Sequence, residues 1–250
     1  MQTTATELRK MQESLRPEGS RNLVLRFNNM PAIQLLNGNR FIVSSPDGDI
    51  SVIDHGFYRD DTRFLSTLTT RINGLPLAAL NSNYSTPYSA EFYLTNPEVP
   101  ETSMGKRIPK ESLMIARHRL IERNLQEDFY VFNVSLQPTK FSLSFEFDAD
   151  FLDLFEVKER VFKDRPDMGK PEDKKVEIAR KINREFLEKQ NVTLFSWKDE
   201  ETGFGAATAA YFSEKGKVEG NKITYDLSLE PSGGNFHVLY GFGPFLGNEL

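Results

Sequence analysis

The sequence predicts an all-β fold, an antiparallel β-sandwich of two sheets with one inserted surface helix. Apolar and polar residues alternate along several short segments, most clearly where Phe141, Phe145 and Phe147 share one face of an expected strand. Turn signals separate these segments. With 20 Phe and 8 Tyr against one Trp, large rings are available to fill a sheet-on-sheet core. At 250 residues the chain fits one large all-β domain.

The beginning of the chain differs from the rest. Apolar residues recur at helical spacing over residues 6–16, but so short a helix is stable only if it docks. From Arg40 the pattern becomes that of strands. We therefore expect an N-terminal segment over residues 1–39, partly helical, and a β-sandwich domain over residues 40–250.

Turn residues place the strands of the first half. Pro46-Asp47-Gly48 joins two β-rich runs. Asn73-Gly74 is the strongest hairpin signal, because both positions of its turn need positive φ. Four prolines make residues 81–110 mostly loop. The strands expected in this half are Arg40–Ser45, Asp49–Asp54, Phe64–Ile72, Leu75–Leu80 and a short one near Phe92–Thr95.

The second half continues the strand pattern with one interruption. A turn is expected near Leu125–Asp128, and a charged surface helix at about residues 165–190, where Val176, Ile182 and Phe186 recur at helical spacing. The expected strands are Leu113–Arg123, Phe129–Leu136, Phe141–Asp150, Val192–Trp197, Ala206–Phe212, Lys222–Leu229 and Asn235–Phe242. About ten to twelve strands follow from this count, which favours a sandwich.

Composition excludes several classes of protein. The chain has no cysteine, so disulfides, thiolate metal sites and a cysteine nucleophile are excluded. The net charge is −5 and no basic stripe predicts nucleic-acid binding. The sequence shows neither a signal peptide nor a run of 18 apolar residues, so we expect a cytoplasmic protein without a membrane segment.

An acidic cluster is the first candidate for chemistry. Asp148, Asp150, Asp153 and Glu156 follow one another closely, and paired carboxylates act as acid and base, or acid and nucleophile, in glycosidases. Charged residues are also ordinary on the solvent face of a strand. A structural or interface role is therefore favoured over catalysis.

Basic residues form a second candidate. Arg117, Arg119 and Arg123 share one parity of an expected strand, which allows either cross-strand pairing with acidic residues or docking of an acidic surface. Cross-strand pairing is the favoured interpretation.

The histidines predict no metal site. His55, His118 and His237 lie far apart in the sequence and no two of them share a ligand motif. No phosphate loop, dinucleotide fingerprint or nucleophile elbow occurs either. We therefore predict no cofactor and no metal.

A polar segment before an expected strand forms the third candidate. Its residues Tyr58, Asp60, Asp61 and Arg63 would be presented by a rigid loop in which an aspartate caps the turn and the arginine forks onto a carboxylate. A structural role and a binding role are about equally favoured.

Several motifs in one order resemble the N-terminal domain of bacterial and archaeal glycogen debranching enzymes of the amylo-α-1,6-glucosidase type. The matching motifs are Asp47-Gly48-Asp49-Ile50, Gly56-Phe57-Tyr58, Asp61-Thr62-Arg63-Phe64-Leu65-Ser66, Asn73-Gly74, Thr95-Asn96-Pro97, Arg117-x-Arg119 and Asp148-Ala149-Asp150-Phe151-Leu152-Asp153-Leu154-Phe155-Glu156-Val157. The resemblance runs from about Arg40 to Phe242. It departs after Val157, where the family has an Arg-Gly pair and this chain has Lys158-Glu159-Arg160.

The resemblance implies a supersandwich-like accessory domain without catalytic residues of its own, because the hydrolytic machinery of the family lies in an (α/α)-barrel domain. The implied partners are this helical barrel, in the same or a separate chain, and an α-glucan oligosaccharide. The residues expected to contact substrate or the neighbouring domain are Tyr58, Asp61, Arg63, Asp150, Asp153 and Glu156.

Two alternatives from other classes remain. The chain is either a stand-alone carbohydrate-binding or assembly module, or, less favoured, a self-sufficient glycosidase that uses Asp150 and Glu156.

Overall fold

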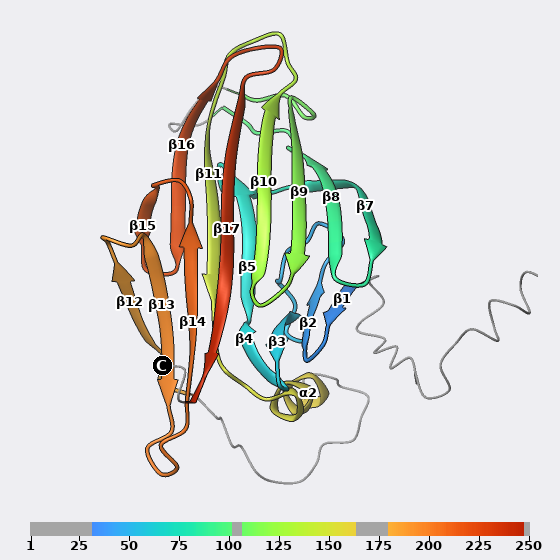
Figure 1. Cartoon of the computed structure of the whole chain (residues 1–250). Coiled ribbons are helices and arrows are strands. Elements are labelled where there is room, and N and C mark those ends of the chain that lie inside the picture. The colour runs from blue at the N-terminus through green and yellow to red at the C-terminus, as the bar shows by residue number, and fades with distance from the viewer. Residues whose placement is uncertain (1–31, 102–106, 164–179, 248–250) are drawn as a thin grey trace, which may run out of the picture. The chain divides into compact units, whose positions relative to one another are not determined.

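A computed structural model describes residues 32–101, 107–163 and 180–247. Over these ranges the chain forms seventeen antiparallel strands and one helix, and the predicted all-β sandwich is confirmed (Figure 1). The expected helix over residues 6–16 and most of the expected helical insertion lie outside the described residues.

The largest sheet has eight strands and forms one layer of the sandwich (Figure 1). Its spatial order is β12 (Asn183–Leu187), β13 (Val192–Lys198), β14 (Gly205–Phe212), β17 (Asn235–Leu246), β10 (Leu125–Asn133), β9 (Leu113–Ile121), β8 (Ser89–Thr95) and β7 (Ala78–Thr86). Residues alternate along β9 and β10 between buried and more exposed positions, so this sheet has one core face and one outer face.

Two smaller sheets form the opposite layer. The five-stranded sheet has the order β15 (Lys217–Glu219), β16 (Lys222–Leu229), β11 (Thr139–Asp148), β5 (Thr67–Ile72) and β6 (Leu75–Pro76). The four-stranded sheet has the order β1 (Ile33–Asn37), β2 (Arg40–Ser44), β3 (Gly56–Arg59) and β4 (Thr62–Leu65). Only Ser66 separates β4 from β5, so the chain passes directly from one small sheet to the other.

Aromatic rings fill the space between the layers. Phe145 of β11 packs against Phe129 of β10 with ring centroids 5.1 Å apart and against Tyr240 of β17 at 4.9 Å. Phe147 makes similar contacts with Phe195 and Phe242. Burying one such side chain stabilises the fold by about 1.5–3 kcal/mol, so the phenylalanine-rich composition accounts for the core.

The four-stranded sheet is fixed to the eight-stranded sheet by polar contacts as well. The Thr208 hydroxyl of β14 donates to the carbonyl of Phe64 at 2.7 Å, and the Asn37 amide donates to the carbonyl of Ile121 at 2.8 Å. Figure 1 shows the helix α2 (Leu154–Lys163) below β3 and β4.

Several local predictions require correction. Asn183–Leu187 form strand β12 instead of the end of a surface helix, and the helix that the structure does show, α2, falls in a segment for which none was predicted. Strand β1 lies before the expected domain boundary at residue 40. Residues 49–54 form a loop with one isolated bridge at Ile50, and the expected turn at 125–128 is part of β10.

Candidate functional site

The loop between β2 and β3, residues 45–55, is held at its first half by two buried arginines. Arg117 and Arg119 project from the core face of β9, and each has no more than 1% of its surface exposed. Arg117 Nη1 donates to the carbonyl of Asp47 at 3.3 Å, and Arg119 Nη2 donates to the carbonyl of Gly48 at 2.5 Å. The eight-stranded sheet therefore holds a loop of the opposite layer.

Glu127 on the neighbouring strand β10 balances these two cations. Its carboxylate accepts from Arg119 Nε at 2.6 Å, from Arg117 Nε and from the Tyr240 hydroxyl at 2.5 Å. Burial alone would raise the pKa of Glu127, but the two guanidinium groups outweigh burial and hold this pKa below its ordinary value. The two arginines therefore favour the ionised form of Glu127 inside the core.

Asp49 supplies the second negative charge of this network. It accepts from Arg117 Nη1 at 3.1 Å and from Arg71 Nη1 at 2.8 Å, and its carboxylate also accepts from the backbone N–H of Thr70 at 3.2 Å. Burial raises the pKa of Asp49 despite the arginine beside it. The network thus reaches from the eight-stranded sheet through the loop to β5 of the five-stranded sheet.

Arg63 holds the second half of the same loop. Its Nη1 donates to the carbonyls of Ile53 at 2.6 Å and His55 at 3.1 Å. Its Nε and Nη2 fork onto the two carboxylate oxygens of Asp150 at 3.0 and 2.5 Å. Asp150 raises the pKa of Arg63 although burial opposes this. Four loop carbonyls therefore accept from three arginines, which makes the loop rigid.

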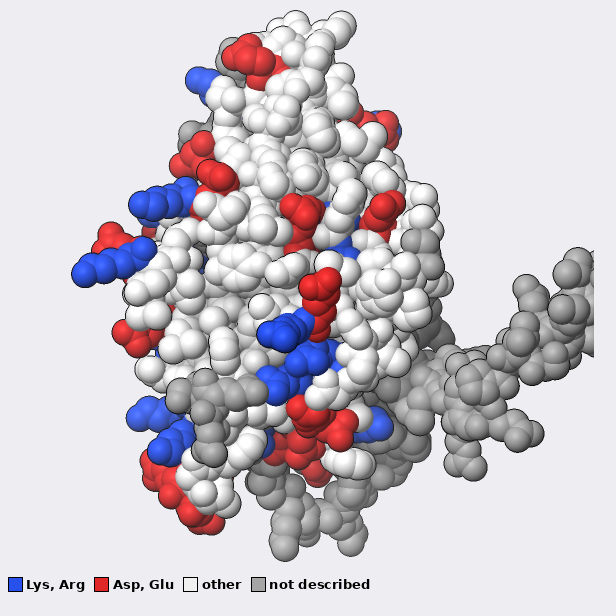
Figure 2. All heavy atoms as spheres, in the orientation of Figure 1, with Lys and Arg blue, Asp and Glu red and all other residues white. Residues whose placement is uncertain are grey.

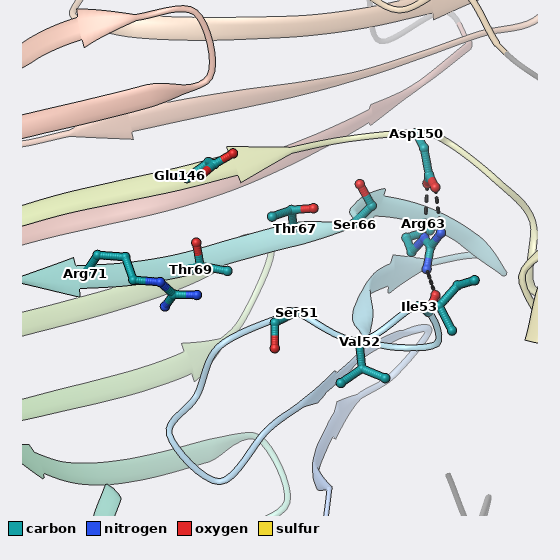
Figure 3. Close-up of a pocket in the computed structure, with 10 residues that line it drawn as sticks. All are labelled: Ser51, Val52, Ile53, Arg63, Ser66, Thr67, Thr69, Arg71, Glu146 and Asp150. Carbon is teal, nitrogen blue, oxygen red and sulfur yellow. Dashed lines mark hydrogen bonds and ion pairs between the residues drawn. The ribbon is translucent and has the colours of Figure 1, made fainter. Parts of the chain in front are cut away.

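The fixed loop forms one wall of a groove of about 500 Å³ (Figure 3). Ser51, Val52 and Ile53 lie on the loop side, and the opposite wall is the outer face of β5 and β11. That wall carries Ser66, Thr67, Thr69, Arg71 and Glu146, and the Arg63–Asp150 pair closes one end.

The groove is suited to binding a hydroxylated ligand. Its lining contains both hydroxyl groups and charged groups, and Arg63 and Arg71 are already paired with Asp150 and Asp49. Glu146 is exposed, and within the described part of the chain it forms no ion pair. A carboxylate and several hydroxyls that face one groove can accept from and donate to the hydroxyl groups of a sugar.

Sequence reasoning did not select Glu146, Thr67 or Thr69 as site residues. A signal was present, because Thr67, Thr69 and Arg71 share one parity of an expected strand and Glu146 lies on the polar face of another. These residues share one wall only because β5 pairs with β11. Neither segment alone predicts that pairing.

Tyr58 does not line the groove. Its ring stacks on Phe41 with centroids 4.5 Å apart, and only 1% of the residue is exposed. Burial raises the pKa of the phenol to about 12. Tyr58 therefore packs beneath the site, together with Leu152 and Val157 of the acidic signature.

Asp153 and Glu156 begin helix α2 with a capping box. The Asp153 carboxylate accepts from the backbone N–H groups of Phe155 at 2.7 Å and Glu156 at 2.9 Å, while Glu156 accepts from the backbone N–H of Asp153 at 2.7 Å. Glu156 also pairs with Arg180 at 2.9 Å. The motif Asp153-x-x-Glu156 is a sequence signal for this helix that the prediction overlooked.

Asp61 lies in the turn between β3 and β4. Asp60 and Asp61 both have positive φ, 48° and 63°, and the side chain of Asp61 is exposed. The carbonyl of Asp61 accepts from the N–H of Leu154, so this turn is joined to the start of α2. Of the six predicted contact residues, the structure thus brings Arg63 and Asp150 together in the groove and places Asp61, Asp153 and Glu156 around α2.

The other charged residues and the histidines considered from the sequence lie outside the groove. Asp148 forks onto Arg184 of β12, at 2.9 Å for the closest pair. Arg123 is exposed beside the turn between β9 and β10. The histidines do not gather as ligands, and among the residues that the structure describes no three His, Asp or Glu side chains could hold a metal.

The fold and the site define an all-β domain with a rigid polar groove. The family model that describes the N-terminal domain of (some) glycogen debranching enzymes matches residues 35–237. The chain therefore belongs to this family, as its motifs predict.

One solved structure of similar fold is described as a putative kojibiose phosphorylase from human microbiome, with 10% sequence identity and a TM-score of 0.52. The similarity covers 86% of this chain and 30% of that chain, and at this identity it shows the fold alone. A search of curated proteins finds no significant match. In the ranges that the structure describes, no helix has the length and apolar character to cross a membrane.

Proposed function

We propose that the chain is a non-catalytic accessory domain that packs on an (α/α)-barrel catalytic domain of the debranching type and contributes a wall to its α-glucan site. Membership of the family supports a role beside such a catalytic domain. The proposed compartment is the cytoplasm, as the sequence predicts. The observation that supports α-glucan binding is the groove. Three buried arginines fix its loop wall without any ligand. A preorganised wall avoids the cost of ordering a loop on binding.

The surface that we assign to the catalytic domain lies around α2. Phe155 has 75% of its surface exposed on this helix, which is unusual for so large an apolar side chain. The turn at Asp61 is bonded to the start of the same helix, and the capping box fixes its first turn. The end of the sandwich with α2 therefore presents an apolar side chain on a rigid base.

The alternative that the chain hydrolyses glycosides alone has less support. An acid and a base must each be free to exchange a proton with substrate. Asp150 is instead forked onto Arg63, and Glu156 is divided between Arg180 and a backbone N–H. Both carboxylates act as structural acceptors.

The test measures glucose release from panose by a debranching-type barrel domain with and without this chain, and by this chain alone. We expect no release by the chain alone, formation of a complex, and a lower KM when the chain is present. Phe155→Ser should weaken the complex, whereas Glu146→Gln should raise KM and leave the complex intact.

Glu122→Gln is the matched control for Glu146→Gln, because Glu122 is also exposed but lies on the turn before β10. Glucose release by the pure chain would overturn the accessory role. Failure to form any complex would overturn the docking assignment.

A further inference from the structure

We infer that the outer face of the eight-stranded sheet carries a second binding site, separate from the groove, for a neutral oligosaccharide. The assignment of this ligand as an α-glucan rests on the proposed function, but the site itself rests on the strand register. Figure 2, which views this face, shows mostly uncharged atoms over β17 and β10, with a few acidic and basic side chains among them.

The register brings together polar residues that are distant in the sequence. Glu91 of β8 pairs with His118 of β9, and His118 pairs with Asp128 of β10, so these three residues form one row across three strands. In the adjacent row, Ser89 pairs with Leu120 and Leu120 with Gln126. A hollow of about 270 Å³ lies over these two rows.

Aromatic side chains stand beside this hollow. Tyr130 and Tyr93 flank Ala116 in the row next to Asp128, His118 and Glu91. Two strand spacings, roughly 9–10 Å, separate the backbones of the two tyrosines, and the residue between them is the small Ala116. Packed rings lie about 4.5–7 Å apart by their centroids, so strands at this spacing allow a sugar ring to lie over Ala116 and contact both phenols.

The rings are held in place. Tyr130 stacks on His237 of β17 with centroids 4.2 Å apart and an angle of 14° between the planes. His237 Nε2 contacts Asp128 Oδ1 at 2.8 Å, and the Tyr93 hydroxyl donates to Glu91 Oε2 at 3.1 Å. This hydrogen bond raises the pKa of Tyr93, which keeps the phenol a donor.

The polar groups match hydroxyl groups better than a cation or an anion. The Arg119 guanidinium points into the core, and among the described residues no lysine or arginine pairs with Glu91 or Asp128. Carboxylates accept, while the imidazole of His118, the amide of Gln126 and the hydroxyl of Ser89 can donate and accept. A sugar hydroxyl both donates and accepts, so it can form hydrogen bonds with all of these side chains. A protonated amine only donates, so it would bond only to the acceptors.

The size of the hollow limits the ligand. A volume of about 270 Å³ lies just below the range of roughly 300–1,000 Å³ that holds drug-sized ligands. The site therefore suits a terminal sugar unit, with the rest of the oligosaccharide extending over the outer face of the sheet.

The test is calorimetric titration of the 250-residue chain with maltoheptaose and with panose. Ala116→Leu fills the space between the two tyrosines without removing a polar group. Ala209→Leu is the matched control, because Ala209 lies on the outer face of β14 in the same sheet, three strands away.

We expect Ala116→Leu to weaken binding at least tenfold and His118→Ala to weaken it roughly tenfold, as for the loss of one well-placed hydrogen bond. Ala209→Leu should bind like the unaltered chain. The inference is overturned if Ala116→Leu binds normally, if Ala209→Leu loses binding equally, or if the unaltered chain binds neither sugar. The proposed function is tested by complex formation and by KM with the barrel domain. Its failure can therefore be distinguished from the failure of this second site, which is tested by titration of the chain alone.

Discussion

At the scale of single residues, Glu127 is the centre of the buried network. It accepts from Arg117, Arg119 and Tyr240 inside a fully closed core. A hydrogen bond to a charged group contributes about 1.5–3 kcal/mol, more than a bond between neutral groups. The network is therefore sensitive to the loss of any one donor.

Tyr240→Phe removes a single donor and leaves the ring in place. We expect the free energy of unfolding to fall by about 1.5–3 kcal/mol, because Glu127 loses a charge-assisted hydrogen bond in the core. Urea denaturation measures the change. Tyr84→Phe is the control, since Tyr84 is 61% exposed and its replacement should shift stability by less than about 0.5 kcal/mol.

The same carboxylate predicts a dependence on pH. The pKa of Glu127 in the folded chain lies below its ordinary value of 4.5. A carboxylate with a depressed pKa stabilises the fold above the ordinary value, and this contribution fades as the pH falls through the folded value. The difference in unfolding free energy between the unaltered chain and Glu127→Gln should therefore be full at neutral pH and shrink below about pH 4.5.

Urea denaturation curves measured from neutral pH to below pH 4.5 test the direction of this change in the unfolding free energy. A difference that grows on acidification would contradict it. Should Glu127→Gln fail to fold, Tyr240→Phe provides the same comparison. Asp49 acts in the opposite sense, because burial raises its pKa and its ionisation therefore destabilises the fold.

At the scale of elements, helix α2 depends on its capping box. Asp153→Ala removes the acceptor for the N–H groups of Phe155 and Glu156, and we expect a loss of about 0.5–2 kcal/mol in unfolding free energy. Asp153→Asn retains a capping oxygen and should lose much less. Equal losses in both variants, measured by urea denaturation, would show that the charge of Asp153 matters more than its cap.

Strands with a local turn signal were predictable from the sequence. The hairpin at Asn73-Gly74 is confirmed, with positive φ of 48° and 80° between β5 and β6. The alternation around Phe145 is confirmed as β11. Both features depend only on neighbouring residues, which is why the sequence displays them.

Features that depend on pairing between distant strands were not predictable. The parity of Arg117 and Arg119 was visible, but their partners Glu127 and Asp49 follow from the register of β9 with β10 and from the course of the loop. The common face of His118 and His237 likewise exists only once β17 pairs with β10. Helix propensity also failed for β12, where pairing with β13 decides the conformation of Phe186.

At the scale of the whole molecule, the buried charges connect the two layers of the sandwich. Arg117 and Arg119 start on the eight-stranded sheet, and Asp49 passes the connection to Arg71 on the five-stranded sheet. Desolvating such charges is expensive, so a buried network of this kind is weak evidence for stability. We attribute to it the position of the loop over residues 45–55.

This interpretation predicts that stability and loop order can be separated. A variant with Arg117→Met, Arg119→Leu, Glu127→Leu and Tyr240→Phe replaces the network by apolar side chains of similar volume. Its unfolding free energy should stay the same or rise, by up to about 4 kcal/mol, because no charge is left unpaired at the centre. The carbonyls of Asp47 and Gly48 lose their donors, so amide hydrogen exchange over the loop should become faster. If stability instead falls as far as in Glu127→Gln, the network holds the layers together energetically, and the assignment of its role to the loop is wrong.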